Sequence, residues 1–542
     1  MTNPEIARAF QLLGKIMELH GDNPFKIRSY SNAYMKLRKL ERPLADMSLE
    51  EISAIPGVGK AITEKIDALR TTGSMPTLDK WLAQTPPGVV EMLGISGFGP
   101  KKVKAVWEGL GVESIGELLY AVNENRLVEL KGFGAKTQAS LKKKLEFVQR
   151  SSGQFHYRTL EVLARQLFAE LKKQFGEEVR WAATGALRRR MPTLTEIELI
   201  TDLPLDRISE LESFENMSSE ALFKATYEEV PVIIYPATAD NWGTVQFERT
   251  GSSEYVAGIS KVGAFKTEAE VFAKLGLEFV SPELREAKDW LVSKGEKEVP
   301  KLLEESDIKG VVHSHSTYSD GINSLREMAV SSRDAGYEYL LITDHSKSAF
   351  YANGLKEDRL REQWAEVDAL NLELAPFRIL KGIESDILND GSLDYPDEVL
   401  AGFDVIIASI HSNLGMDKEK ATERLITAIK NPYTHILGHP TGRLLLSREG
   451  YPIDHLAVIE ACAEHGVCIE LNANPYRLDL DWSWIPVALE KGVPISVNPD
   501  AHSVGGIHDI RYGVLAARKG GLTAEMCLNT RGVKDFLAWF GK

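Results

Sequence analysis

The sequence predicts a protein of several domains, with a helical N-terminal region, a mixed α/β middle and a C-terminal α/β barrel. A length of 542 residues suits roughly three to five domains of ordinary size. Short segments with a Gly-x-Gly pair recur about every 35–40 residues within residues 55–138, as in repeated helix–turn–helix units. From residue 308 onward, strand-like apolar runs alternate with helical segments, which favours parallel strands joined by crossover helices.

The composition is that of a globular protein, with 43% hydrophobic and 26% charged residues. Its three cysteines, Cys462, Cys468 and Cys527, form no Cys-x-x-Cys pair, so neither a disulfide framework nor a cysteine zinc site is indicated. The N-terminus lacks the pattern of a signal peptide, and no run of 18 or more apolar residues occurs. We therefore expect a cytoplasmic protein with no membrane partner.

The charge is distributed unevenly along the chain. Residues 1–150 contain 22 lysines and arginines and 17 acidic residues, a net charge of +5. Since the whole chain carries −14, the remaining 392 residues carry −19. A basic front suits nucleic acid, and acidic clusters in the rear can bind metal ions, which reverse the local field toward phosphate.

Three repeated segments in the N-terminal region predict contacts with DNA: IPGVGKAI (55–62), ISGFGPKKV (95–103) and LKGFGAKTQ (130–138). Glycine lets the backbone approach a phosphate, and the following helix offers its N-terminal N–H groups. The candidate DNA-binding residues are Gly57, Gly59, Lys60, Gly97, Gly99, Lys101, Gly132, Gly134 and Lys136. Such contacts would be independent of base sequence. Tight connections between helices are the alternative, and the run Lys142–Lys144 is interpreted as a solvated helix face.

The middle of the chain contains three strand-like segments, EVRWAATGA (178–186), EIELIT (196–201) and VPVIIYP (230–236), separated by helical patterns. The stretch 281–307 is rich in glutamate and lysine and is expected to be a linker.

Metal-binding side chains stand at the ends of the strand-like runs in the C-terminal domain. His313 and His315 lie two residues apart, as do Asp500 and His502, a spacing that puts both side chains on one face of a strand. In an α/β barrel the C-terminal strand ends meet at one site. The expected ligands are His313, His315, Asp320, His345, Glu384, His411, His439, Asp500 and His502.

This set of ligands predicts two or three divalent ions, since nine groups are too many for one. Imidazole and carboxylate ligands suit manganese or zinc, with iron as a third candidate. Such a centre attracts a phosphate ester, supplies activated water and stabilises the charge that develops when the ester is cleaved. Arg443, four residues after His439, is expected to hold a phosphate oxygen. The sequence therefore predicts a metal-dependent phosphoesterase.

The segments HSHSTYSDG, ITDHS, GIESDI, ASIHS, GHPTGR and NPDAH closely resemble the PHP (polymerase and histidinol phosphatase) domain. The string GHPTGRLLLSREGY resembles the PHP domain fused to bacterial family X DNA polymerases. This resemblance implies a distorted (β/α)₇ barrel with up to three metal ions. It also implies 3′–5′ exonuclease and abasic-site endonuclease activities in a DNA-repair protein that associates with the bacterial nucleoid.

The N-terminal segments resemble the lyase and fingers regions of the same polymerases, and IPGVGKAITEKI is a close match. Lys65 then occupies the position of the Schiff-base lysine of the lyase, with an ordinary helical lysine as the alternative. The expected domains are a lyase-like domain (1–82), a helix-hairpin-helix fingers-like domain (83–150), a nucleotidyltransferase-like palm and thumb (151–290) and the PHP domain (308–542).

The segment TGALRRRMPTLTEIELI (184–200) resembles the polymerase motif but departs from it at the catalytic positions. Gly185 and Arg188 are kept, whereas Ala186 replaces a serine, Glu196 and Glu198 replace both aspartates, and Ile233 stands at the third carboxylate position. Because two metals must lie about 3.5–4 Å apart, longer and missing acids should impair their placement. We expect a weak or inactive polymerase core, which would need Mg²⁺ or Mn²⁺ only if it is active.

The leading hypothesis is therefore a DNA-repair nuclease, acting as a monomer on gapped, recessed or abasic DNA. A working polymerase with a proofreading exonuclease is the first alternative. A small-molecule phosphoesterase and a non-enzymatic DNA-binding protein are the others. The Gly-x-Gly segments argue against a small substrate, and the complete ligand set argues against a protein without catalysis.

Overall fold

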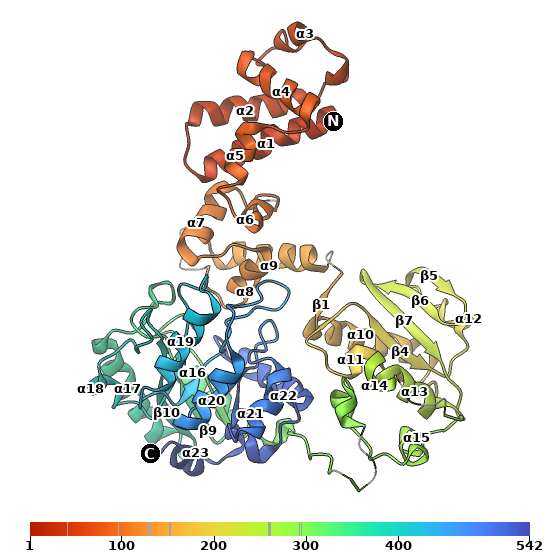
Figure 1. Cartoon of the computed structure of the whole chain (residues 1–542), viewed down its shortest axis with the longest axis vertical. Coiled ribbons are helices and arrows are strands. Elements are labelled where there is room, and N and C mark those ends of the chain that lie inside the picture. Colours follow the sequence, from red (N-terminus) through yellow and green to blue (C-terminus); the bar gives the residue numbers. More distant parts are fainter. Residues whose placement is uncertain are drawn as a thin grey trace. The chain divides into compact units, whose positions relative to one another are not determined.

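The structure is a computed structural model that describes residues 1–40, 42–95, 97–127, 130, 132–150, 153–257, 259, 262–291, 293, 295–296 and 298–541. Ser96 and Lys131 of the repeated segments, and residues 292, 294 and 297 of the expected linker, lie outside this description. The chain forms two compact units, Met1–Phe147 and Val148–Lys542 (Figure 1). No helix in the described residues has the length and apolar content needed to cross a bilayer.

The first unit is built from helices in its described residues (Figure 1). They are α1 (Asn3–Leu19), α2 (Pro24–Leu37), α3 (Leu49–Ser53), α4 (Lys60–Thr72), α5 (Pro76–Leu82), α6 (Pro87–Met92), α7 (Pro100–Leu110), α8 (Ile115–Asn123) and α9 (Ala135–Arg150). α1 is amphipathic and buries Ile6, Phe10 and Leu13 in the core of this unit. The helical N-terminal region predicted from the sequence is confirmed.

Each Gly-x-Gly segment ends directly at the start of a helix: α4 follows Gly59, α7 follows Gly99 and α9 follows Gly134. The first glycine of each pair, at positions 57, 97 and 132, has a positive φ, between +78° and +96°. A side chain at these positions would be strained, so the repeated turn requires glycine there. The three segments are thus copies of one backbone turn.

The second unit begins with a mixed five-stranded sheet in the order β2-β4-β7-β6-β5. These strands are β2 (Trp181–Ala183), β4 (Ile197–Thr201), β7 (Val230–Pro236), β6 (Phe223–Tyr227) and β5 (Glu215–Ser219). A separate short pair joins β1 (Phe155–His156) to β3 (Thr193–Leu194). The three strands expected in this region are present as β2, β4 and β7.

Helices accompany this sheet, the longest being α10 (Tyr157–Phe175), whose apolar side faces the core. The others are α11 (Gly185–Arg188), α12 (Leu205–Ile208), α13 (Trp242–Thr250), α14 (Ser253–Val256) and α15 (Glu268–Leu275). This α+β arrangement agrees with the fold class predicted for the middle of the chain.

Seven parallel strands in sequence order form the C-terminal barrel (Figure 1). They are β8 (Gly310–Val312), β9 (Tyr339–Ile342), β10 (Arg378–Asp386), β11 (Val405–Ser409), β12 (Ile436–Leu437), β13 (Cys468–Asn472) and β14 (Ile495–Asn498). A parallel bridge between Ser314 and Ala501 brings the two edge strands together. Asn529 strengthens this closure, since its amide donates to the carbonyls of Gly310 and Val497. The predicted barrel is therefore confirmed.

Helices lie between and beyond the barrel strands. They are α16 (Leu325–Asp334), α17 (Glu357–Glu373), α18 (Asp397–Leu400), α19 (Lys418–Ile429), α20 (His455–His465), α21 (Ile485–Glu490), α22 (Ile510–Lys519) and α23 (Val533–Trp539). Because every strand runs in the same direction, the loops after the strands gather at one end of the barrel.

The charged stretch expected to be a free linker is packed in its first residues. Arg285 is fully buried, and its guanidinium lies 2.5 Å from a carboxylate oxygen of Glu268. Glu283 pairs with Arg518, and Glu286 pairs with Lys519. These charges connect the mixed sheet region to helix α22 of the barrel, so the linker interpretation is wrong for residues 281–286.

Candidate metal centre and nucleic-acid interface

The loops that follow the barrel strands carry the predicted metal ligands. His313 and His315 follow β8, His345 follows β9, and His411 follows β11. Glu384 lies near the C-terminal end of the long strand β10. His439 follows β12, Asp500 and His502 follow β14, and Asp320 lies in the turn after β8. The parallel topology therefore delivers groups that are far apart in the sequence to one end of the barrel.

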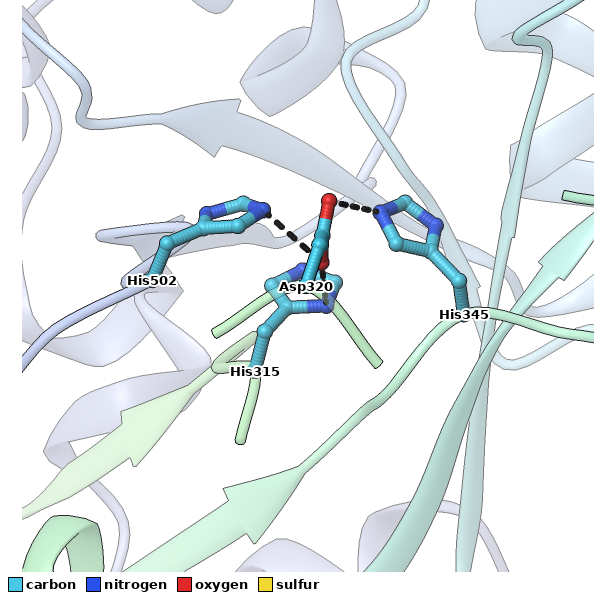
Figure 2. Close-up of side chains that lie close together, drawn as sticks. All are labelled: His315, Asp320, His345 and His502. Atoms are coloured by element: carbon cyan, nitrogen blue, oxygen red, sulfur yellow. Dashed lines mark ion pairs between the residues drawn. The ribbon is translucent and has the colours of Figure 1, made fainter. Parts of the chain in front are cut away.

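Four groups of side chains lie close enough to hold metal ions, with ligand atoms within 4.8 Å of one another. Together they contain all nine predicted residues. The groups are His315, Asp320, His345 and His502; His313, Glu384 and His439; His313, His315 and Asp500; and His345, Glu384 and His411. Figure 2 shows the first group, in which Asp320 lies among three imidazoles.

Glu384 occupies a central position among these groups. Its Oε1 lies 3.0 Å from Nε2 of His439 and 3.1 Å from Nε2 of His411. Its other oxygen, Oε2, lies 3.0 Å from Nδ1 of His345. One carboxylate thus contacts three imidazoles from three loops.

The cluster is buried, and burial acts against charge on its imidazoles. Burial and the nearby rings of His502 and His345 lower the pKa of His315 to about 3. For His313, burial also acts downward, but Glu470, Asp500 and Glu384 outweigh it and raise its pKa well above the usual range. The pKa values of these two neighbouring histidines therefore shift in opposite directions, because each ring faces a different set of charges.

The side chains fit divalent cations better than a purely hydrogen-bonded network. Among the described residues, Nε2 of His313, Nδ1 of His315, both ring nitrogens of His345 and Nδ1 of His439 are buried and form no hydrogen bond. Buried polar atoms are normally satisfied, so several such nitrogens facing carboxylates fit a site that binds cations. Imidazole and carboxylate donors together suit manganese, zinc or iron.

Three of the predicted ligands have strained backbones. The φ angles of His313, His439 and Asp500 are +66°, +20° and +50°, respectively. Residues other than glycine rarely adopt such values, and they persist only where the surrounding structure enforces them. The strained backbone therefore occurs at positions whose side chains belong to the cluster.

A second layer of carboxylates orients the imidazoles, and sequence reasoning missed it. Glu470 on β13 lies 2.6 Å from Nδ1 of His313 and accepts the backbone N–H of His439. Asp386 lies 2.6 Å from Nδ1 of His411. Asp344, next to His345 in sequence, accepts hydrogen bonds from Ser316 and Gln363. The motifs ITDHS, GIESD and CIELNAN contain these three acids, but their spacing alone does not show what they contact.

Arg443 contacts acceptors of its own chain. Its guanidinium donates to Asp481 at 2.5 Å, to the carbonyl of Arg477 at 3.1 Å and to the carbonyl of Leu478. These contacts use three of the five N–H groups of the guanidinium. Arg443 therefore holds the loop after His439 against the chain near Leu478, and its contact with a phosphate stays a prediction.

In the first unit, glycines and lysines surround the repeated turns. An added Cβ at Gly59, Gly99 or Gly134 would meet nothing within 4 Å, so no internal contact explains glycine there. Lys60, Lys101 and Lys136 are exposed. A pocket of about 350 Å³ lies between the second and third segments, lined by Gly97, Phe98, Lys102, Lys136, Thr137, Ser140, Leu141 and Lys144. Lys144 lines this pocket, in contrast to the solvated face expected for it.

Comparison with known proteins identifies the family. The profile of a helix-hairpin-helix domain matches residues 1–75, and that of a SAM-like helix-hairpin-helix tandem matches residues 89–146. The chain is 35% identical to the DNA polymerase/3′-5′ exonuclease PolX of Bacillus subtilis (strain 168), over 99% of each chain. The chain belongs to the bacterial family X DNA polymerases with a PHP domain.

Other relatives match a smaller share of the chain. It is 31% identical to a probable phosphatase of Thermoanaerobacter sp. (strain X514), over 42% of this chain and 92% of that protein. It is 30% identical to a probable phosphatase of Caldanaerobacter subterraneus, over 42% of this chain and 89% of that protein. These matches fall in the C-terminal half, which carries the barrel and its cluster.

The family X palm motif is present, but its acids are arranged unusually. Glu198 on β4 pairs in register with Ile233 on β7, the position where the family pattern has a third acid. An added Cβ at Gly185 would lie 1.5 Å from Oε2 of Glu198, so this carboxylate covers the glycine turn. The same oxygen accepts the N–H of Ala186 at 3.3 Å, and Tyr235 donates to Oε1 at 3.0 Å.

The arginines of this motif are held by acids of the chain itself. Arg188 forms a bidentate pair with Glu268. Arg189 pairs with Glu286. The third, Arg190, donates to the hydroxyl of Tyr157. Glu196 is half-buried on the approach to β4. The motif thus stabilises the region internally, and its basic groups already have partners.

Proposed function

We propose that this family X protein is a DNA-repair nuclease whose barrel removes nucleotides from DNA 3′ ends in the 3′–5′ direction. The observation that carries this proposal is the convergence of nine imidazole and carboxylate groups at one end of the barrel. The name of the Bacillus subtilis relative supports the direction of hydrolysis. Incision at abasic sites is the second activity we propose for the same cluster.

The nine predicted residues would hold two or three divalent ions, with Mn²⁺ or Zn²⁺ favoured and Fe²⁺ as a third candidate. Such ions supply positive charge for the scissile phosphate and lower the pKa of a bound water. Glu384 holds the imidazoles of three loops in one place, while Glu470 and Asp386 fix the rings of His313 and His411.

A nuclease assay on 3′-recessed and abasic DNA with Mn²⁺ tests the proposal. We expect the wild-type protein to shorten the recessed strand. We expect Glu384→Ala to do so at least about 100-fold more slowly, because the Glu384 carboxylate contacts three of the other predicted ligands. His455→Ala is a matched control, since His455 stacks on Trp484 away from the cluster groups. Trimming that survives Glu384→Ala would refute the site.

We further propose that the polymerase core is inactive or weak. Glu198 covers the Gly185 turn and takes the N–H of Ala186, and Ile233 has no oxygen to offer a metal. Burial is the main cause that raises the pKa of Glu198, and Glu196 adds to it. A raised pKa disfavours the ionised carboxylate that binds Mg²⁺ or Mn²⁺.

Primer extension in the Glu384→Ala background separates this from the alternative of an active polymerase, because trimming no longer hides synthesis. We expect no extension with deoxynucleotides and either metal. Extension that disappears when Glu198→Ala is added would show that the palm is a working polymerase.

We propose that the first unit binds gapped, recessed or abasic DNA through backbone phosphates, and that the protein works as a monomer. The four expected domains, 1–82, 83–150, 151–290 and 308–542, remain our proposed division. The two helix-hairpin-helix matches and the lysine-lined pocket support DNA binding.

Lys65 is our candidate for the lyase nucleophile. It lies on α4, and its Nζ donates to the carbonyl of Ala61 at 3.3 Å and lies 5.8 Å from the ring centre of Tyr30. Borohydride trapping on incised abasic DNA should give a covalent adduct with the wild type and none with Lys65→Ala. An equal yield of adduct from both would rule Lys65 out.

A further inference from the structure

Two large apolar side chains are exposed on loops that carry members of the metal cluster. Phe350, which is 86% exposed, lies five residues after His345. Ile322, which is 51% exposed, lies two residues after Asp320. An exposed aromatic ring on a loop that carries a cluster residue offers a flat apolar face on which a base of a bound strand can stack.

The loop that carries Phe350 is fixed to the cluster. Ser348 donates through Oγ to Asp386 at 2.7 Å, and Asp386 in turn holds the ring of His411. The next residue after Phe350, Tyr351, has its ring centre 6.1 Å from that of His345 and 6.3 Å from that of His411. Phe350 opens the short 3₁₀ helix Phe350–Ala352, directly next to a ring that borders the cluster.

The loop that carries Ile322 is also anchored. The N–H of Ile322 donates to the carbonyl of His502 at 2.9 Å. Its neighbour Asn323 accepts the N–H of Val504 at 3.0 Å. The two loops meet where the side chain of Asn353 reaches the carbonyl of Tyr318 at 3.5 Å. Phe350 and Ile322 therefore belong to two loops that each contact cluster residues or their partners and that touch at Asn353 and Tyr318; we call these two loops the rim.

We propose that this rim binds the unstacked bases of the DNA strand whose 3′-terminal phosphodiester enters the cluster, with Phe350 as the stacking surface and Ile322 as an apolar contact. The inference rests on the proposed nuclease function and specifies its substrate as a single-stranded 3′ end. Aromatic side chains stack on any base, so the contact would favour single strands without selecting a sequence. A phosphate monoester without a base would gain nothing from it.

Steady-state trimming of a single-stranded oligonucleotide with Mn²⁺ tests this contact. We expect Phe350→Ala to raise KM roughly 10-fold or more, as loss of one stacked base does, and to change kcat less than about twofold. Ile322→Ala should raise KM by a smaller factor, about threefold, and Phe350→Trp should keep the wild-type KM. Leu372→Ala is the matched control, because it removes an 87% exposed apolar side chain at the C-terminal end of α17.

A second substrate, in which the last two nucleotides lack bases, isolates stacking from any disturbance of the loop. On this substrate Phe350→Ala and the wild type should have the same KM. An equal effect of Phe350→Ala on both substrates, or no effect on either, would overturn the inference. If the wild type trims neither substrate, the proposed nuclease function itself fails, so the two failures are distinguishable.

Discussion

At the scale of single residues, the cluster depends on carboxylates that are not ligands themselves. Glu470 is fully buried on β13 and receives the amide groups of Asn472 and Asn498 as well as the ring of His313. A carboxylate behind an imidazole fixes the orientation of the ring and makes its other nitrogen a better donor to a metal. Glu470 therefore acts on the centre through His313.

We predict that Glu470→Gln lowers the affinity for Mn²⁺ by about 10–100-fold, the usual cost of losing such a partner. Calorimetric titration of the metal-free protein with Mn²⁺ measures this directly, without reference to activity. Glu460→Gln is the matched control, because Glu460 pairs with Lys491 on the surface. Equal Mn²⁺ affinities for wild type and Glu470→Gln would contradict the prediction.

At the scale of elements, the repeated turns and helices of the first unit create a basic pocket. Phe98 and Phe133 from neighbouring repeats pack edge to face at 6.1 Å, which joins the second and third segments. Lys102 and Lys136 come from the first turns of α7 and α9, and Lys144 comes from two turns further along α9. Helix starts and lysines thus favour the same ligand, a phosphate.

We predict that each of Lys102→Ala, Lys136→Ala and Lys144→Ala weakens DNA binding and lowers the salt dependence of log K by about 0.9, the value for one phosphate contact. Fluorescence anisotropy with duplex DNA at several salt concentrations gives both quantities. Lys143→Ala is the control, since Lys143 is exposed on the same helix and does not line the pocket. A slope unchanged in all three variants would exclude the pocket as a phosphate site.

At the scale of the whole second unit, the mixed sheet region is joined to the barrel by buried polar contacts. His156 on β1 lies 3.1 Å from the carbonyl of Leu445, in the loop after His439. Lys519 on α22 donates to the carbonyl of Arg189 and to Glu286. Glu161 on α10 pairs with Arg511. Burial lowers the pKa of Lys519 to about 8 and that of His156 to about 4.

This junction predicts a loss of stability in acid. The pKa of His156 is about 4 in the folded protein, below its ordinary 6.5, so the unfolded chain binds more protons between these values. The contribution of neutral His156 to the free energy of unfolding is fully present above pH 6.5 and is lost as pH falls toward 4. By pH 5, about 2 kcal/mol of it has been lost. Urea unfolding of wild type and His156→Gln at pH 7 and pH 5 measures it. Parallel losses in the two proteins would contradict the assignment.

The amino-acid sequence by itself determined the barrel, the glycine turns and the convergence of nine candidate ligands at one end of the barrel. This convergence could be predicted because parallel strands bring every strand end to one side, so a histidine or acid after each apolar run has a known destination. The glycine turns could be predicted because a positive φ and close approach both restrict the residue type. In each case, the deciding physics is local to a short segment.

Only the tertiary structure decided which polar groups meet across long sequence separations. Glu470 resembles any acid inside a strand until β13 is placed next to His313, which is 157 residues earlier in the chain. Arg443 follows the candidate ligand His439 in sequence, yet three of its donors face Asp481 and two carbonyls. Glu283 and Glu286 lie in a segment that reads as a solvated linker, but in the folded chain they form ion pairs with Arg518 and Lys519. A charged side chain reaches several angstroms in any direction, so its partner is set by packing and not by its neighbours in the sequence.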